Sequence, residues 1–514
     1  MILIIKNRRI FTMKLTNILA LLLCLVTVMT LLVSCVEGKG DGKATDSHKE
    51  TESGTKSPET TEQSDTAEQT TEKNETTAEI ETEPQFVEDN LPDMTFNKDF
   101  KLYTWKYGLQ YEFCDIYMLG GVDEQLYARQ QHLKDKYGIN IVRTQRDGRL
   151  DYKESFIKGI EVNKSETADK AYDAIGAYMM FSGSMAMKGL LSDISDKNIA
   201  PHIDLGKPWW PDDLLDNAKI NGKLYGITGD ITPMFLMTRD VVHVNLDLFE
   251  KYNPGVNIYD VVRNKEWTYD KVYELFINNS SIGDDITGFG LPDPTTGDAL
   301  FYSSGMRLSG TSSDGKYAMR NPAEDKELSD IYSFIYKFQE DACYDITKSA
   351  ASQFGDGKYV AVMEAFLITS RHKFRKAILP MPMYMTANGT VQDEYRSGVS
   401  IWTTVYSIPS YSPDNELSSF TLEALASFSY RRVMPALLEE EFSWRNENSK
   451  DNKDMVGIIL DGSIFDTTCL LSAEFNYYEL MRKPLLKFAD ASTYYNENVG
   501  KWDEKVNEIN QKLG

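Results

Sequence analysis

The 514-residue sequence has few of the side chains that carry metal or nucleophilic chemistry, with five cysteines and five histidines. No two cysteines form a C-x-x-C pair, so the sequence indicates neither a zinc ribbon nor a redox dithiol. It also lacks H-E-x-x-H, G-x-S-x-G and the glycine-rich phosphate-binding loops. We therefore expect no catalytic residues, no metal site and no cofactor. The disulfide state of Cys114, Cys343 and Cys469 stays open.

Positive charge is also scarce. The chain has 55 Lys and Arg against 78 Asp and Glu, a formal net charge of -23. Binding of duplex nucleic acid needs a basic face, so we exclude nucleic acid as a partner. Residues 36–90 hold 16 acidic residues and 5 lysines, so about half of the net charge lies in one short segment.

The N-terminus is the longest apolar part of the sequence. Basic residues within the first 14 positions precede an apolar run over 18–33, which is followed by Ser34 and Cys35. This order is typical of a secretory signal, and a transmembrane anchor is the alternative. The end of the run, Leu-Val-Ser-Cys, resembles a bacterial lipobox, which implies cleavage after residue 34 and a lipid on the sulfur of Cys35. Translation from Met1 or from Met13 fits equally.

Residues 35–95 are rich in Thr, Glu and Ser and have almost no large apolar side chains. Such a segment buries too little surface to offset the entropy lost on ordering. We expect a disordered tether with a reach on the order of 40 Å. Anchor, spacer and globule suit a protein held at a membrane surface.

The remaining residues, 96–514, alternate in pattern. Strand-like runs at 100–105, 139–142 and 171–175 alternate with helical patterns at 123–137 and 152–162, which indicates βαβ units and a largely parallel sheet. The segment 234–244 is again strand-like. Apolar residues at helical spacing over 331–338 and 502–513 predict a helical C-terminal region. The sequence therefore predicts an α/β fold.

A series of short phrases in the middle of the chain is more specific. In order they are Lys207-Pro208-Trp209-Trp210, Asn221-Gly222-Lys223-Leu224-Tyr225-Gly226, Thr228-Gly229-Asp230, Asn245-Leu246-Asp247-Leu248-Phe249, Trp267-Thr268-Tyr269-Asp270, Phe354-Gly355-Asp356-Gly357-Lys358 and Leu379-Pro380-Met381-Pro382. This series resembles the family 1 extracellular solute-binding proteins of bacterial ABC importers, whose best-known relatives bind maltose and other oligosaccharides. It looks closest to a lipoprotein branch of the Firmicutes.

The resemblance implies a two-lobed, periplasmic-binding-protein-like (type II) fold with a hinge, a central ligand cleft and a helical C-terminal region. Placed on this sequence, lobe 1 covers about 96–235 and 366–410, and lobe 2 covers about 240–362 plus part of 415–514. The chain is expected to cross between the lobes near 233–240, 363–368 and 408–415. Closure of the cleft would bury the ligand.

Sugars present flat C–H faces and many hydroxyl groups, so a sugar site needs aromatic platforms and polar side chains. We expect ligand contacts from seven residues, each with a structural role as the alternative: Trp209, Trp210, Asp230, Trp402, Tyr178, Glu364 and Arg307. Residues 178–181 read Tyr-Met-Met-Phe and lack the carboxylate that maltose-binding relatives have there. This departure argues against maltose itself.

The resemblance implies a non-enzymatic, monomeric substrate-binding component, lipid-anchored on the extracytoplasmic face of the membrane. Its expected partners are a carbohydrate and the ABC permease subunits. Two alternatives stay open at this stage: a surface lipoprotein enzyme that degrades glycans, and a sensor module that presents a ligand to a membrane receptor. The sequence does not identify the ligand.

Overall fold

The computed structural model describes residues 87–283, 285–291, 296–344, 349–367, 372–386, 388–443, 449–476, 478–487 and 491–514. Residues 82–514 form one compact unit. The expected signal peptide (1–34), Cys35 and nearly all of the expected tether (35–95) lie outside the described residues.

The first lobe is built on a four-stranded sheet in the order β12-β3-β1-β2. Strand β1 (Lys98–Trp105) runs parallel to β2 (Ile139–Arg146) and β3 (Ala174–Tyr178), whereas β12 (Thr404–Ser407) is antiparallel to β3. Helices α3 (Gly121–Tyr137) and α4 (Lys153–Asn163) connect the parallel strands. The predicted alternation of strands and helices is confirmed here.

The second lobe has a five-stranded sheet in the order β10-β4-β9-β5-β8. Its strands are β4 (Asp240–Asn245), β5 (Thr287–Leu291), β8 (Cys343–Tyr344), β9 (Tyr359–Ala365) and β10 (Lys376–Leu379). Strand β4 lies antiparallel between β10 and β9. Strands β3 in the first sheet and β4 in the second are buried along nearly their whole length, so each sheet lies at the centre of its own core.

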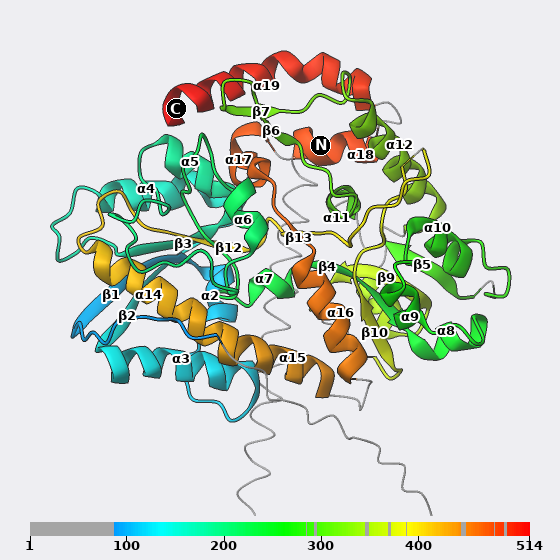
Figure 1. Ribbon diagram of the computed structural model, residues 1–514, viewed down its shortest axis with the longest axis horizontal. Coiled ribbons are helices and arrows are strands. Elements are labelled where there is room, and N and C mark those ends of the chain that lie inside the picture. Colours follow the sequence, from blue (N-terminus) through cyan, green and yellow to red (C-terminus); the bar gives the residue numbers. More distant parts are fainter. Residues whose placement is uncertain are drawn as a thin grey trace, which may run out of the picture. The chain divides into compact units, whose positions relative to one another are not determined.

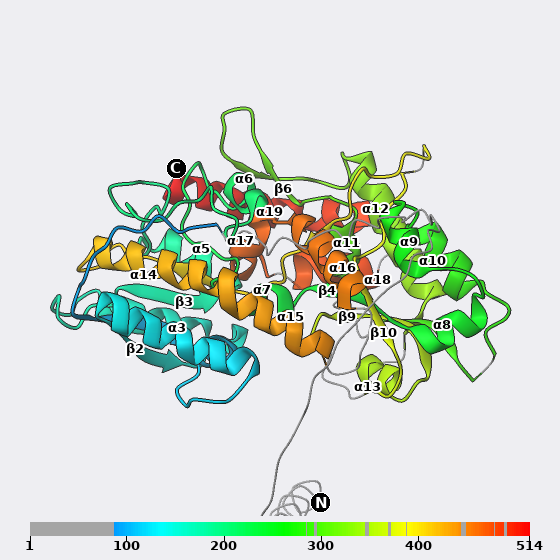
Figure 2. The ribbon, with the colours of Figure 1, turned by 60° about the horizontal axis from the view of Figure 1, so that its bottom comes forward.

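The helical C-terminal region contacts both lobes. Helices α14 (Asn415–Phe428) and α15 (Met434–Ser443) lie beside α3, whereas α16 (Ser449–Asp461) packs on β10. Helix α17 (Thr467–Phe475) contacts α5 (Ser182–Met187) in the first lobe, and α19 (Ala491–Leu513) contacts both α5 and α12 (Lys326–Asp341). Figures 1 and 2 show α19, in red, running from one lobe to the other.

The remaining helices and strands are short: α2 (Lys106–Glu112), α6 (Asp212–Asn217), α7 (Met234–Met237), α8 (Leu246–Tyr252), α9 (Ile258–Arg263), α10 (Tyr269–Val272), α11 (Thr296–Ser303), α13 (Ala350–Gly355), α18 (Lys483–Lys487), β6 (Ser309–Thr311), β7 (Tyr317–Met319), β11 (Ser397–Gly398) and β13 (Ser463–Ile464).

Within the described residues, the chain passes between the sheets at α7–β4, at the link from β11 to β12, and at β13. The first passage is at the expected 233–240. The region 366–410, which we expected in lobe 1, begins instead in the second lobe, because β10 pairs with β4 and the chain joins the first sheet only at β12. The crossings expected near 363–368 and 408–415 therefore need correction. Strand β9 turns back into its own sheet, and β12 leads into α14 within the first lobe.

Candidate functional site

A cavity of about 220 Å³ lies where the chain passes between the two sheets. Its walls come from α2 in the first lobe, from β4, β9 and α11 in the second, and from the link between β11 and β12. The C-terminal region adds one side chain. The lining residues are Tyr107, Thr238, Asp240, Asp298, Ala299, Tyr302, Glu364, Ala365, Gly398, Val399, Ser400, Ile401, Trp402 and Arg482.

One wall of the cavity is aromatic. The indole of Trp402 and the ring of Tyr107 have centroids 5.6 Å apart, and the two residues are 36% and 39% exposed. Behind them, the ring centroids of Trp402 and Tyr178 are 5.2 Å apart, and Tyr178 stacks on Trp105 with their ring centroids 5.1 Å apart. The Trp105 indole N–H donates to the hydroxyl of Thr404 at 2.8 Å, which ties this ring to β12. The buried rings therefore support two aromatic rings that line the cavity and are each more than a third exposed.

Trp402 is held in place by its own short loop. Backbone Val399 N–H donates to the Ile464 carbonyl at 3.0 Å, and Thr403 N–H donates to the Ser400 carbonyl at 3.0 Å. At Gly398 an added Cβ would lie 2.7 Å from the Cβ of Tyr302, so the loop lies against α11 too closely for any side chain at this position. The sequence Gly-Val-Ser-Ile-Trp thus places the indole at the cavity.

Another wall of the cavity is polar. The carboxylate of Asp298 on α11 accepts from the guanidinium of Arg482, with Nη2 at 2.7 Å and Nε at 2.9 Å from Oδ2. Both side chains are mostly buried. Glu364, near the end of β9, accepts from Ala365 N–H at 3.1 Å. Fixed charged and polar groups on one side and aromatic faces on another can hold a polar solute that also has apolar faces.

Two of the seven predicted site residues, Trp402 and Glu364, line this cavity. A third, Tyr178, is buried directly behind Trp402 and is not among the lining residues. Burial raises the pKa of its hydroxyl, so Tyr178 is a neutral supporting ring. Because the seven were proposed from position and residue type alone, their contact with a ligand stays a prediction.

Trp209 and Trp210 do not reach the cavity. Both are fully buried in the first lobe, and each indole N–H donates to the carboxylate of Glu423 on α14 at 3.0 Å. In this structure both side chains anchor the loop, which is the structural alternative to ligand contact, and ligand contact by either residue stays a prediction.

Asp230 and Arg307 also lie away from the cavity. Asp230 lies in the turn after Gly229, where its N–H donates to the Trp209 carbonyl at 3.1 Å, and burial raises the pKa of its carboxyl to about 7. Arg307 is paired with Asp213 on α6 at 2.5 Å, and its Nε donates to the Phe465 carbonyl at 2.8 Å. Arg307 thus joins two segments of the fold rather than facing the cavity.

Three further residues that line the cavity were not predicted from the sequence: Tyr107, Asp298 and Arg482. Tyr107 had a usable signal, because it comes directly after β1 and the carboxyl ends of parallel strands are where α/β sheets present ligand contacts. Arg482 had none. It lies at the end of a π-helical turn, Tyr478–Arg482, in the C-terminal region, and only tertiary packing brings it to α11.

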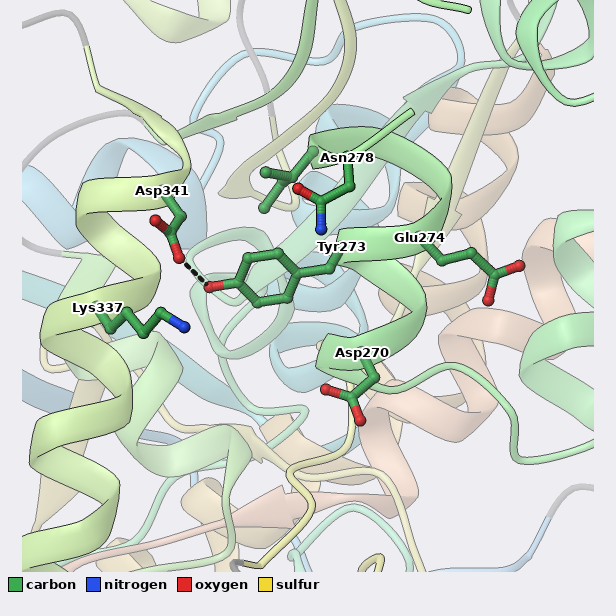
Figure 3. Close-up of a pocket in the computed structure, with 7 residues that line it drawn as sticks. Asp270, Tyr273, Glu274, Asn278, Lys337 and Asp341 are labelled. Atoms are coloured by element: carbon green, nitrogen blue, oxygen red, sulfur yellow. Dashed lines mark hydrogen bonds between the residues drawn. The ribbon is translucent and has the colours of Figure 1, made fainter. Parts of the chain in front are cut away.

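A second hollow, of about 780 Å³, lies on the surface of the second lobe between α12 and the chain from α10 onward. Figure 3 shows the Tyr273 hydroxyl directed at the carboxylate of Asp341, to which it donates at 2.8 Å. The neighbouring side chains are mostly charged and exposed, among them Asp270, Glu274 and Lys337. With a single aromatic ring and no deep wall, this hollow is the weaker candidate.

Within the described residues, no group of three or more His, Cys, Asp or Glu side chains is placed to hold a metal ion. Across the same residues, no helix combines the length and the apolar character that a membrane span requires.

No protein-family model and no curated protein matches the sequence. Solved structures do match. A cyclo/maltodextrin-binding protein complexed with maltotetraose has 15% identity and a TM-score of 0.50, covering 80% of this chain and 98% of that one. UgpB from Mycobacterium tuberculosis, in complex with glycerophosphocholine, has 9% identity and a TM-score of 0.51 over the same shares. A family 1 extracellular solute-binding protein from Bifidobacterium longum subsp. infantis has 12% identity and a TM-score of 0.48, covering 81% and 98%.

Both of the first two structures match nearly their whole length to this chain, so the likeness takes in both of its sheets. At these identities the likeness concerns the fold. The expected fold class is confirmed: this chain has the two-lobed α/β fold of periplasmic-binding-protein-like proteins.

Proposed function

We propose that this protein is the substrate-binding component of a bacterial ABC importer and that it captures a carbohydrate between its lobes. The observation that carries the proposal is the cavity at the chain passages, which combines the Trp402 and Tyr107 rings with the Asp298–Arg482 pair. A similar fold holds maltotetraose in one solved structure. No chemical change of the solute is required by this arrangement.

The two walls suit the two kinds of surface on a sugar ring. The C–H face of a pyranose is apolar and packs on an aromatic face, whereas its hydroxyl groups need donors and acceptors. Trp402 and Tyr107 provide the faces. Arg482 donates and Glu364 accepts, and both are held in fixed positions by the protein itself. We expect the ligand to lie with one ring against Trp402.

Location and partners are part of the proposal and are supported by the sequence. The signal-like N-terminus and the Leu-Val-Ser-Cys motif favour export, cleavage before Cys35 and a lipid anchor on the extracytoplasmic face. The acidic, Thr-rich segment after it suits a spacer. The protein would act as a monomer that delivers its solute to membrane permease subunits.

The test is ligand binding to the soluble chain that begins at residue 36. A glycan panel that includes maltotetraose is screened by thermal shift, and hits are measured by calorimetry. A ligand at about 100 times its Kd stabilises the folded state by about 2.7 kcal/mol, which raises the melting temperature by several degrees. No shift with any glycan, or release of shorter saccharides, would contradict a non-enzymatic carbohydrate-binding role.

Trp402→Ala then locates the site. Loss of the aromatic platform should raise the Kd by about tenfold or more, the equivalent of about 1.4 kcal/mol, with little change in melting temperature because the indole is partly exposed. Tyr152→Ala is the matched control, since Tyr152 is 42% exposed on the first lobe and does not line the cavity. Equal affinities for the two variants would place the ligand elsewhere.

A further inference from the structure

Arg239 lies directly beneath the candidate site. Its sequence neighbours, Thr238 and Asp240, both line the cavity, whereas Arg239 itself is completely buried. It belongs to the passage from α7 to β4, the first point at which the chain leaves the first lobe. Its side chain points into the protein and not toward a solute.

The guanidinium of Arg239 contacts the passages on either side of its own. Its Nη1 donates to the Ser397 carbonyl in β11 at 2.8 Å, and its Nη2 donates to the Ser463 hydroxyl in β13 at 2.8 Å. Its Nε donates to the Phe235 carbonyl at 3.1 Å, and the guanidinium lies 4.4 Å from the centroid of the Phe235 ring. One side chain therefore joins all three described passages.

The segments that Arg239 contacts are continuous in sequence with residues that line the cavity. Strand β11 pairs with β13 in parallel through Ser397–Ser463 and Gly398–Ile464, and the loop that carries Trp402 follows at once. The backbone carbonyl of Arg239 also accepts from Phe366 N–H at 2.6 Å, which fixes the end of β9 next to Glu364. Both predicted residues that line the cavity are thus within a few residues of an Arg239 contact.

Burial of the Arg239 guanidinium is energetically unfavourable, so its presence indicates a role that an uncharged side chain could not fill. Removal from water lowers the pKa of Arg239 to about 9, an effect that the charges of Asp213 and Asp240 only partly offset. The three groups that accept hydrogen bonds from its guanidinium are neutral. Burial of a charge that has only neutral acceptors is unfavourable. An apolar side chain would avoid this penalty, but it could not donate hydrogen bonds in fixed directions to two backbone carbonyls and the Ser463 hydroxyl.

We propose that Arg239 is a positioning residue that fixes the Gly398–Trp402 loop against the hinge passages, so that ligand binding depends on a side chain that never touches the ligand. The link to binding rests on the proposed function, whereas the positioning of the loop does not. The proposal predicts that the loop loosens when Arg239 is replaced even in the absence of any ligand.

The test is hydrogen exchange of the unliganded soluble chain from residue 36, read by mass spectrometry at Ser397 and Val399. Their amides donate to the Gly462 and Ile464 carbonyls at 2.9 and 3.0 Å. In Arg239→Met we expect exchange at these amides to rise about tenfold, as for the loss of one buried hydrogen bond. Arg239→Lys should recover only part of the protection, because an ammonium group cannot reach both strands in the fork geometry of arginine.

Ile160→Ala is the control, since Ile160 is fully buried on α4, away from the passages, and its truncation lowers global stability. It should leave the two amides as protected as in the wild type. If Arg239→Met fails to fold, Ser463→Ala removes one acceptor of Arg239, together with the hydrogen bond that this hydroxyl donates to the Leu460 carbonyl, and should speed exchange by a smaller factor. The same exchange in Arg239→Met as in Ile160→Ala, or no change in Ser463→Ala, would overturn the positioning role.

Carbohydrate affinity is a separate readout. If the wild type binds no glycan while Arg239→Met speeds exchange at Ser397 and Val399, the proposed function fails and the positioning role stands. If the wild type binds a glycan and Arg239→Met binds it as tightly despite faster exchange, the coupling of the loop to binding is refuted.

Discussion

Glu423 illustrates how a single carboxylate can fix a distant loop. It is fully buried on α14 and accepts from the indole N–H groups of Trp209 and Trp210, and one of its oxygens lies 3.2 Å from the Asp204 amide. The two tryptophans were predicted as ligand contacts from residue type alone. Their partner is more than 200 positions away in the sequence, so no local pattern could show that both indoles face inward.

Burial raises the pKa of Glu423 to about 7 from its usual value of 4.5. The folded state therefore holds this proton more tightly than the unfolded state does. The resulting stabilisation is complete below about pH 4.5 and is lost as the pH rises through about 7, with a total on the order of 3 kcal/mol.

We expect Glu423→Gln to flatten this part of the pH dependence, because glutamine does not titrate. At pH 5 the variant should be less stable than the wild type by about 1 kcal/mol, since the amide offers one acceptor to two indole donors. The gap should close as the pH rises and reverse in sign before pH 8, because the wild type loses about 2.5 kcal/mol of this stabilisation between pH 5 and pH 8 and the variant loses none of it. Urea unfolding from pH 5 to 8 measures this, with the exposed Glu416→Gln as control. Parallel curves for wild type and Glu423→Gln would contradict the assignment.

At the scale of single elements, local signals predicted structure well where the cause is local. Asn221 and Gly222 both have positive φ, as the tight turn typical of an Asn-Gly pair requires, and Thr268 caps α10 by accepting from Lys271 N–H. The helical pattern predicted over 123–137 agrees with α3 to within two residues, since the helix begins at Gly121 after the N-cap Gly120. Strand β10 was predicted in lobe 1 but pairs with β4 in the second lobe. The residues of a strand do not by themselves show which other strand it will pair with.

The end of helix α3 gives a prediction at this scale. Gly138 has φ +65°, and an added Cβ would lie 2.5 Å from Asn97 Oδ1 and 2.9 Å from the Asn97 backbone nitrogen. Both the left-handed conformation and the backbone contact disfavour a side chain. Gly138→Ala should lower the free energy of unfolding by about 1–3 kcal/mol in urea titration.

Gly500 is the matched control within another helix. It lies in α19 with no atom within 4 Å of an added Cβ. Gly500→Ala should stabilise the protein by about 0.5–1 kcal/mol, because alanine loses less backbone entropy on forming a helix. Destabilisation by both substitutions to a similar extent would mean that the helix end is not what makes Gly138 necessary.

At the scale of the whole molecule, we propose that the two lobes and the helices that contact both of them form the binding unit, and that the N-terminal segment determines where that unit acts. The fold class was predictable, because βαβ alternation and the ordered phrases cover most of 96–514. The composition of the cavity was not, since its walls come from six separate stretches of chain that meet only in the folded state.

Substitutions in the N-terminal segment can distinguish two ways of attaching the whole molecule to a membrane, a lipid anchor and a transmembrane anchor. A lipoprotein keeps its membrane attachment through the sulfur of Cys35, whereas a transmembrane anchor depends on the apolar run over 18–33 and not on any one thiol. We expect Cys35→Ser to abolish incorporation of labelled fatty acid and to block cleavage, which leaves a precursor of higher mass in cells. Cys24→Ser lies within the same apolar run and should behave like the wild type. If Cys35→Ser and Cys24→Ser both give the same mass and the same membrane association as the wild type, the apolar run itself is the anchor. The proposed binding of a solute by the chain from residue 36 does not depend on which anchor is present.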